Sequence, residues 1–307
     1  MSAAASSAPV ALFFFNRPEH ARRTLEALVR NDAAIQTDVF IYCDGPRDER
    51  DKAEVGRVRT LAATVTGFRS VHIVCEETNL GLSQSIIRGV TEVVEQHGRV
   101  IVVEDDIVTA RSFLTYMNDA LERYADEPRV WHISGWNYPI SSKDIAPFFF
   151  WQVMNCWGWA TWADRWTHYR KEPARLLRDW SDERIRAFNL DGACDFFAQV
   201  RDTASGQIDT WDIFWYATIF ENEGLCLNPT RSFARNIGLD GTGIHGEQRR
   251  EQEIDLYRAY EGLPKLQVTP NAEAISRVRA HLRSQRSIGF RLSRRLDQLI
   301  HRLSRGR

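Results

Sequence analysis

The first hundred residues alternate between short apolar runs and amphipathic stretches. Four runs of aliphatic and aromatic residues have the length and composition of buried β-strands, at 10–15, 39–43, 71–74 and 100–103. Apolar residues at helical spacing follow each run, at about 19–31, 48–64, 82–96 and 109–124. Strands that alternate with helices through short connections predict an α/β fold with a mostly parallel, doubly wound sheet flanked by helices.

Polar clusters follow each predicted strand. They lie at 16–17, 44–45, 79–81 and 104–106. Ligands of doubly wound sheets bind beyond the carboxyl ends of the strands, where such clusters meet. We therefore expect these four clusters to face one crevice.

The most informative cluster is Glu104-Asp105-Asp106, directly after the apolar run 100–103. Carboxylates at the end of a buried strand repel one another, and a low dielectric strengthens the repulsion. A divalent cation removes this conflict, and Mg²⁺ or Mn²⁺ usually binds through one or two carboxylates, with phosphate oxygens and water as further ligands. In the other interpretation, Asp105 and Asp106 only cap the helix predicted at 109–124.

The second half of the chain is rich in aromatic residues. A strand and loop are predicted at 131–137, an apolar run lies at 148–151, and helices are predicted at 163–169 and 213–222. Most tryptophans are expected in the core, because a large ring stabilises most when it is buried.

Glycine between two tryptophans, at Trp157-Gly158-Trp159, leaves the backbone open to an approaching group, and a sugar presents apolar faces to such rings. Trp157 or Trp211 is the ring we expect to stack on a ligand. Asp209 or Thr210 is a candidate cap of the helix at 213–222, and Asp212 in its first turn would compensate the helix dipole.

A glycine-rich segment at 236–246 contains four glycines in eleven residues. Such a loop can bring its amides close to phosphates and can act as a lid. It has neither the P-loop nor the Rossmann fingerprint. His245 within it is open to three interpretations: a surface histidine, a phosphate donor or a metal ligand.

Composition narrows the class of protein. The 307 residues, 43% of them hydrophobic, suffice for one extended α/β domain or a domain with a subdomain, and the net charge of −1 gives no overall field that would attract nucleic acid. The five scattered cysteines are typical of reduced thiols. The run at 10–15 is too short for a signal peptide or a membrane span, so we expect a cytoplasmic protein.

The C-terminal segment 276–307 is strongly basic, and Asp297 is its only acid. Its apolar residues recur at helical spacing, at Leu292, Leu296, Leu299, Ile300 and Leu303. A basic amphipathic helix is typical of peripheral contact with an anionic membrane, here the inner face. The alternative is a helix that docks on its own domain or on a second subunit.

Taken together, these stretches resemble the GT-A fold glycosyltransferases, closest in pattern to the N-acetylglucosaminyltransferases that initiate complex N-glycans and to bacterial sugar transferases. The resemblance runs over 9–250 and implies a Rossmann-like fold with a nucleotide-binding half at 9–130 and an acceptor and catalytic half at 131–250. A flexible N-terminus at 1–8 and a helical extension at 251–307 complete the expected organisation.

The nucleotide-binding half carries the first set of matching motifs. The triplet after the strand matches the DXD-type site, which implies that Asp106 is the direct metal ligand, with Asp105 nearer the ribose and Glu104 nearer the donor sugar. Asn16-Arg17 resembles the motif that contacts the nucleotide. Asp44 corresponds to the acid that recognises uracil.

The second half of the chain carries the other matching motifs. Ser134-Gly135-Trp136-Asn137 resembles a Ser-Ala-Trp-Asn segment, Gly158-Trp159 resembles a Leu-Gly-Trp segment near donor and acceptor, and Gly243-Ile244-His245-Gly246 resembles the Ser-His-Gly end of the donor-closing loop. Trp211-Asp212 falls where the family has a Trp-Asp pair whose aspartate is the catalytic base. Two positions depart from the pattern, since Ile213 replaces a second acid and Ile244 replaces a serine.

The function implied is a metal-dependent, inverting transfer of a hexosyl or N-acetylhexosaminyl group. The expected donor is a nucleotide sugar, UDP-linked by resemblance, the cofactor Mn²⁺ or Mg²⁺, and the acceptor a hydroxyl of a glycan or lipid-linked molecule, as in polysaccharide biosynthesis. The competing interpretations are a non-catalytic protein of the same fold that binds nucleotide sugars or glycans, and a Mg²⁺-dependent nucleotidyltransferase or phosphotransferase.

Overall fold

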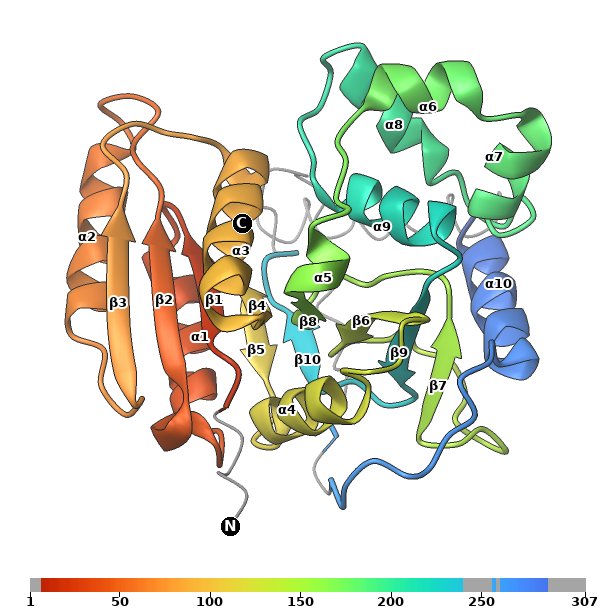
Figure 1. Ribbon diagram of the computed structural model, residues 1–307. Helices are drawn as coiled ribbons and strands as arrows, with labels where there is room; N and C mark the ends of the chain where they lie inside the picture. Colours follow the sequence, from red (N-terminus) through yellow and green to blue (C-terminus); the bar gives the residue numbers. More distant parts are fainter. Residues whose placement is uncertain (1–6, 240–255, 258–259, 287–307) are drawn as a thin grey trace, which may run out of the picture.

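A computed structural model describes residues 7–239, 256–257 and 260–286 (Figure 1). Within this part of the chain, eight strands form one sheet in the order β3-β2-β1-β4-β8-β6-β9-β7. Their bounds are β1 Val10–Phe14, β2 Asp38–Cys43, β3 Ser70–Cys75, β4 Arg99–Glu104, β6 Val130–Ser134, β7 Phe148–Trp151, β8 Trp159–Trp162 and β9 Leu225–Pro229. Helices cover the sheet, which confirms the predicted α/β class.

The helices fall between and after these strands. In chain order they are α1 Pro18–Val29, α2 Lys52–Ala63, α3 Leu82–His97, α4 Phe113–Arg123, α5 Ala163–Trp166, α6 Pro173–Asp179, α7 Asp182–Phe188, α8 Phe197–Ala204, α9 Asp212–Glu221 and α10 Ala272–Arg286, with a 3₁₀ turn at Ala34–Gln36. Successive β1 side chains alternate between two cores. Leu12 and Phe14 belong to the core that includes α1 and α4, and Ala11 and Phe13 belong to the core that includes α3 and α9.

Strand direction fixes where a ligand can bind. Strands β1 to β4 are mutually parallel, with β2 and β3 on one side of β1 and β4 on the other. This reversal of strand order is a topological switch point, and ligands of open α/β sheets bind beyond the carboxyl ends of the strands at such a point. Strand β8 runs antiparallel to both β4 and β6, so β6 points the same way as β4 and ends at the same edge.

The predicted helix at 109–124 is wrong at its start. Ile107–Thr109 forms β5, which pairs antiparallel with β10 at Ala234–Asn236, and the helix begins only at Phe113. Ser112 is its N-cap residue and accepts no capping hydrogen bond. Asp105 and Asp106 therefore do not cap this helix, and that interpretation of the acid triplet is excluded.

The start of the basic C-terminal segment docks on the protein itself. In α10, Ala274 and Val278 are fully buried. Arg277 donates to the carbonyls of Ser141 and Lys143, and Arg279 pairs with Asp191. The predicted stripe at 292–303 lies outside the described residues. No helix in the described ranges has the length and apolar character needed to cross a membrane.

Candidate functional site

The switch point holds a shared ion pair. Arg17 follows β1, and its Nε donates to Asp105 Oδ2 at 3.2 Å. Its Nη2 contacts Asp105 Oδ1 and donates to Asp106 Oδ2 at 2.8 Å. The side chains of Asp105 and Asp106 are only 7% and 11% exposed. These contacts bring two of the four predicted polar clusters, those at 16–17 and 104–106, together through Arg17.

The β5–β10 ribbon fixes the second aspartate of this pair. Asn236, at the end of β10, donates from Nδ2 to Asp106 Oδ1 at 3.3 Å, and the amide of Ile237 donates to the Asp106 carbonyl at 2.8 Å. The backbone of Gly238 lies so close to the Asp106 side chain that a Cβ there would be 2.1 Å from Asp106 Oδ2. Sequence reasoning did not single out Asn236, because its partner lies 130 positions away along the chain.

The acid triplet carries more negative charge than Arg17 neutralises. Burial and the charges of Asp106, Asp105 and Asp212 raise the pKa of Glu104 well above its usual value. Burial raises the pKa of Asp105 to about 6, against the opposing effect of Arg17. Asp212 therefore lies within electrostatic reach of the triplet, although it belongs to α9 in the other half of the chain.

This donor set fits a hard divalent ion that arrives with a phosphate ligand. The described residues contain no group of three or more His, Cys, Asp or Glu side chains arranged to hold a metal. Mg²⁺ does not require such a cage, since it commonly binds through one or two carboxylates and substrate phosphates. Carboxylate oxygens in excess of the available positive charge are the suitable chemistry, and Asp106 and Asp105 supply them.

Asp212 is held by one oxygen. Its Oδ1 accepts from the Thr210 hydroxyl and from the amide of Ile213 at 2.8 Å, while Oδ2 has no hydrogen-bond partner in the described part of the chain. Neither Asp209 nor Thr210 caps α9, because Trp211 is the N-cap residue and makes no side-chain cap. The cap prediction is wrong, and the Thr210 hydroxyl instead orients Asp212.

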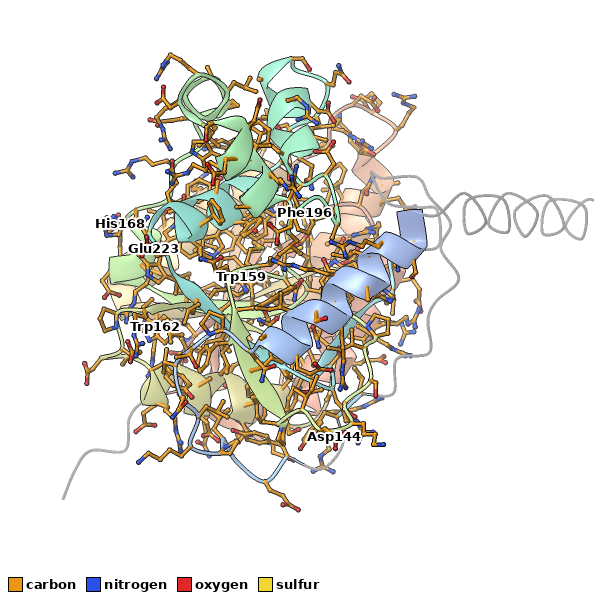
Figure 2. The ribbon with its side chains drawn as sticks, turned by 90° about the vertical axis from the view of Figure 1, so that its right-hand side faces the viewer. Asp144, Trp159, Trp162, His168, Phe196 and Glu223 are labelled. Carbon is orange, nitrogen blue, oxygen red and sulfur yellow. The ribbon has the colours of Figure 1, made fainter. Side chains whose placement is uncertain are left out.

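A column of rings positions this end of α9. Trp159 on β8 stacks on Trp211 with centroids 5.2 Å apart and on His132 at 5.3 Å. Trp159 and Trp211 are 0% and 2% exposed, so both are core residues, and Figure 2 shows Trp159 inside the molecule. Trp157, by contrast, is partly exposed and lies 4.5 Å from the Trp136 ring in a T-shaped contact.

Cys156 is a further residue at the site that the sequence did not mark. Burial and the charges of Asp212, Glu104 and Asp106 raise the pKa of its thiol well above the usual value. The thiol thus lies near carboxylates from both halves of the chain and stays protonated at neutral pH. Its only sequence signal was its place before Trp157-Gly158-Trp159.

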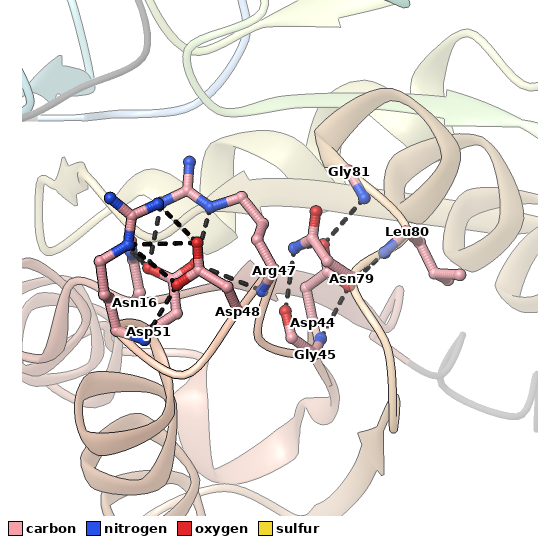
Figure 3. A network of polar contacts seen from close by, with 10 residues as sticks. Asn16, Asp44, Gly45, Arg47, Asp48, Asp51, Asn79, Leu80 and Gly81 are labelled. Carbon is pink, nitrogen blue, oxygen red and sulfur yellow. Dashed lines mark hydrogen bonds and ion pairs between the residues drawn. The ribbon is translucent and has the colours of Figure 1, made fainter.

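Asp44 shapes the loop beside the crevice (Figure 3). Its Oδ1 accepts from the amides of Gly45 and Leu80, and its Oδ2 accepts from the amide of Gly81 and from Asn79 Nδ2, all at 2.8–3.0 Å. These four bonds use the acceptor positions of the carboxylate. Gly45 permits the close approach, since a Cβ there would lie 2.3 Å from the Thr78 carbonyl carbon.

Asn16 contacts a different acid from its neighbour Arg17. Its Nδ2 donates at 2.8 Å to Asp51 Oδ1, and Arg47 donates to the same carboxylate (Figure 3). The Arg47 guanidinium also lies 4.9 Å from the centre of the Phe15 ring. Asn16 therefore anchors the loop before α2. Gly243 and His245 lie outside the described residues.

Comparison with known proteins gives little further information. No protein-family model and no curated protein matches the chain. Among solved structures, the chain is similar to the mannosyltransferase PcManGT from Pyrobaculum calidifontis, in complex with GDP-Man and Mn²⁺, at 11% identity and a TM-score of 0.36. The likeness covers 70% of this chain and 69% of that chain.

Proposed function

We propose that this protein transfers a sugar from a nucleoside-diphosphate donor to an acceptor hydroxyl group, with Mn²⁺ or Mg²⁺ as cofactor. The observation that carries the proposal is the meeting of Arg17, the acid triplet and Asp212 at the carboxyl edge of the sheet, over its switch point. A diphosphate needs positive charge, and an attacking hydroxyl needs a base. Arg17, together with a cation held by Asp105 and Asp106, would supply the charge, and Asp212 from the other half of the chain is the candidate base.

Each residue has a distinct part in the proposed reaction. Asp106, assisted by Asp105, would hold the ion, which when bound neutralises the charge that develops on the departing diphosphate. Arg17 lies against the same carboxylates and can donate to a phosphate oxygen. The assignment of Glu104 to a hydroxyl of the donor sugar rests on the sequence resemblance.

Asp212 is the proposed base. Thr210 and Ile213 fix its Oδ1, which leaves Oδ2 to accept the proton of the acceptor hydroxyl. The hydroxyl oxygen bonds to the anomeric carbon as the bond from that carbon to the phosphate oxygen breaks, and the nucleoside diphosphate leaves. A single displacement of this kind inverts the configuration.

The remaining assignments differ in their support. The UDP-linked donor, the hexosyl or N-acetylhexosaminyl group and the glycan or lipid-linked acceptor rest on the resemblance in sequence. Because the Asp44 carboxylate is already saturated with hydrogen bonds, we propose that it shapes the 79–81 loop for the nucleotide base. Among the aromatic candidates, partial exposure favours Trp157 as the ring that contacts sugar. Trp211 supports Asp212 from the core, where its ring stacks on that of Trp159.

A donor screen tests the proposal. Purified protein is incubated with Mn²⁺ or Mg²⁺ and a panel of UDP- and GDP-sugars, and release of nucleoside diphosphate is measured. Metal-dependent release from at least one donor is expected, and Asp106→Ala should abolish it. Asp212→Asn should lower turnover by about 100-fold or more while the dissociation constant of the nucleotide stays the same. Asp209→Asn, which loses only the ion pair with Lys171, should lower turnover by no more than about tenfold.

Other results would contradict the proposal in recognisable ways. Release of pyrophosphate from nucleoside triphosphates would indicate a nucleotidyltransferase. Metal-dependent binding of a donor without turnover, in the presence of membrane extracts as a source of acceptor, would indicate a binding protein. Loss of turnover in Asp209→Asn but not in Asp212→Asn would refute the assignment of the base.

A further inference from the structure

Within the described ranges, buried polar atoms without hydrogen-bond partners gather where β6 ends and β8 begins. They are Ser134 Oγ, Trp136 Nε1, Trp159 Nε1 and both side-chain atoms of Asn137. We call these four residues the β6-end cluster. Ser134 and Trp159 are paired across β6 and β8, and Trp136 and Asn137 follow Ser134 in the chain. All four residues are at most 8% exposed.

The Asn137 side chain is the clearest member of the cluster. Asn137 is 2% exposed, and among the residues that the structure describes only its backbone is bonded, to the Ser232 hydroxyl. Asn31 provides the contrast at 5% exposure. Its Nδ2 donates to the Ala27 carbonyl and to Thr109 Oγ1, and its Oδ1 accepts from the Leu114 amide. A buried amide without partners destabilises the folded protein, so Asn137 has no evident structural reason to be polar.

The chemistry of the cluster defines what would satisfy it. It offers N–H donors from two indoles and an amide, one amide acceptor and a hydroxyl that can do both, and it contains no charged group. The rings of Tyr138 and Trp157 lie 4.8 and 4.5 Å from the Trp136 ring. Uncharged hydrogen-bonding groups beside aromatic rings suit a neutral sugar, which has hydroxyl groups at its rim and apolar C–H faces.

The cluster lies within reach of the proposed metal-binding residues. Ser232, bonded to Asn137, is four residues from Asn236, which donates to Asp106. Four residues span at most about 14 Å, so a diphosphate at Asp106 and a sugar at Asn137 belong to one substrate site.

We propose that the β6-end cluster is the subsite for a neutral sugar ring and that Asn137 determines its specificity through hydrogen bonds to the hydroxyl or acetamido groups of that ring. This inference rests on the proposed function and names its substrate class as uncharged sugars. The ring belongs either to the donor or to the acceptor, and the experiment below separates the two sources.

The first measurement is stability, with Asn137→Leu and Asn31→Leu as a matched pair. Leucine replaces the amide with an apolar group of similar size. Asn31→Leu should lower Tm by several degrees, because it leaves the Leu114 amide without its partner. Asn137→Leu should leave Tm unchanged or raise it, because it removes an unsatisfied polar group. An equal fall of Tm in both variants would overturn the inference.

The second measurement is activity on the nucleotide-sugar panel. Asn137→Leu should bind UDP or GDP with Mn²⁺ as the wild type does but lose about 100-fold in kcat/KM, because the sugar loses hydrogen bonds in a dry site. If kcat/KM already falls for hydrolysis of the donor in the absence of acceptor, the ring belongs to the donor. If kcat/KM falls only for transfer to an acceptor, the ring belongs to the acceptor. Unchanged kcat/KM, or a preference for UDP-glucuronate over every neutral donor, would overturn the inference.

Failure of the proposed function has a different signature, which is that the wild type binds no nucleotide with Mn²⁺. The subsite is then tested with free sugars alone. Glucose, galactose, mannose or N-acetylglucosamine at high concentration should raise Tm of the wild type and not of Asn137→Leu. Equal shifts, or no shift with any of these sugars, would overturn the subsite.

Discussion

At the scale of single residues, the acid triplet depends on Arg17. One guanidinium nitrogen contacts both Asp105 and Asp106, and the Arg17 side chain is only 20% exposed. Removing one partner of a buried ion pair leaves the other charges uncompensated, which costs more than the pair itself contributes. The carboxylates then need another cation.

The first prediction follows from this dependence. Arg17→Gln should lower the free energy of unfolding by about 3 kcal/mol, and Mn²⁺ should restore part of the loss by binding the freed carboxylates. Urea unfolding with and without Mn²⁺ measures both effects. Arg69→Gln is the control, because its pair with Asp38 is at the surface and should contribute less than about 1 kcal/mol. Equal losses in the two variants would contradict the prediction.

His132 gives the fold a dependence on pH. Its Nδ1 accepts from Trp215 Nε1 at 3.2 Å, so the proton is on Nε2, which donates to the Asn155 carbonyl at 3.2 Å. Burial lowers the pKa of His132 to about 3, from 6.5 for the free side chain. Between these values the unfolded chain binds the proton and the folded chain does not, so stability rises with pH across this window.

The second prediction is that acidification from pH 6.5 towards 4 destabilises the protein through His132, by about 1.4 kcal/mol per pH unit. In His132→Gln this contribution should vanish, so the loss of stability across the same range should be smaller. Urea unfolding at a series of pH values tests it. A profile of His132→Gln parallel to that of the wild type would be the contrary result.

The sequence predicted the residues of the site better than their contacts. Arg17, Asp105 and Asp106 were identifiable because they follow apolar runs whose strands must end at one edge of the sheet. Asn236 and Cys156 were not, because each reaches the acid triplet only through tertiary structure. Burial was predicted for most tryptophans and holds for Trp159. Trp211, a candidate to stack on a ligand, is also buried, and the sequence could not show this because an aromatic residue has the same sequence signal in a core as in a binding surface.

At the scale of elements, local periodicity located the strands and helices of the first half of the fold. It failed where a strand pairs with a partner far away along the chain. The strands β1 to β4 and helices α1 and α3 lie within a few residues of their predicted places. The predicted helix at 48–64 starts late, at Lys52, because Asp51 and Asn16 hold the preceding loop. Strand β5 was missed because its partner β10 comes more than a hundred residues later.

The third prediction concerns the ribbon of β5 and β10. Gly238→Ala should displace the Asp106–Arg17 pair, since its Cβ would lie 2.1 Å from Asp106 Oδ2 and 2.7 Å from Arg17 Nη1. Metal-dependent release of nucleoside diphosphate should fall about tenfold or more. Gly56→Ala, on α2, is the control, because no atom lies within 4 Å of its added Cβ. It should keep activity and gain about 0.5–1 kcal/mol of stability. Full activity of Gly238→Ala would show that Asp106 tolerates displacement.

At the scale of the whole molecule, the two halves of the chain share one sheet and also contact each other through side chains outside it. Antiparallel strand β8 joins β4 to β6. Outside the sheet, Lys171 donates from Nζ to Ser83 Oγ of α3 at 2.7 Å. It also pairs with Asp209, three positions before Asp212. A cation from the second half of the chain is thereby bound both to α3, in the first half, and to the segment that carries the proposed base. We therefore expect the placement of Asp212 relative to the acid triplet to depend on this contact.

The fourth prediction is that Lys171→Met costs little stability but much activity. Because Asp209 is 65% exposed, losing the contacts of Lys171 should lower the free energy of unfolding by only about 1 kcal/mol. Turnover should fall about tenfold, since a small displacement of a base reduces the rate steeply, while the dissociation constant of the nucleotide changes little. Lys171→Arg should restore part of the turnover by keeping the charge. Lys52→Met, which breaks a surface pair with Glu49, is the control and should leave turnover unchanged. If Lys171→Met instead loses stability with full turnover, the contact only holds the halves together, and the column of rings beneath Trp211 alone places Asp212.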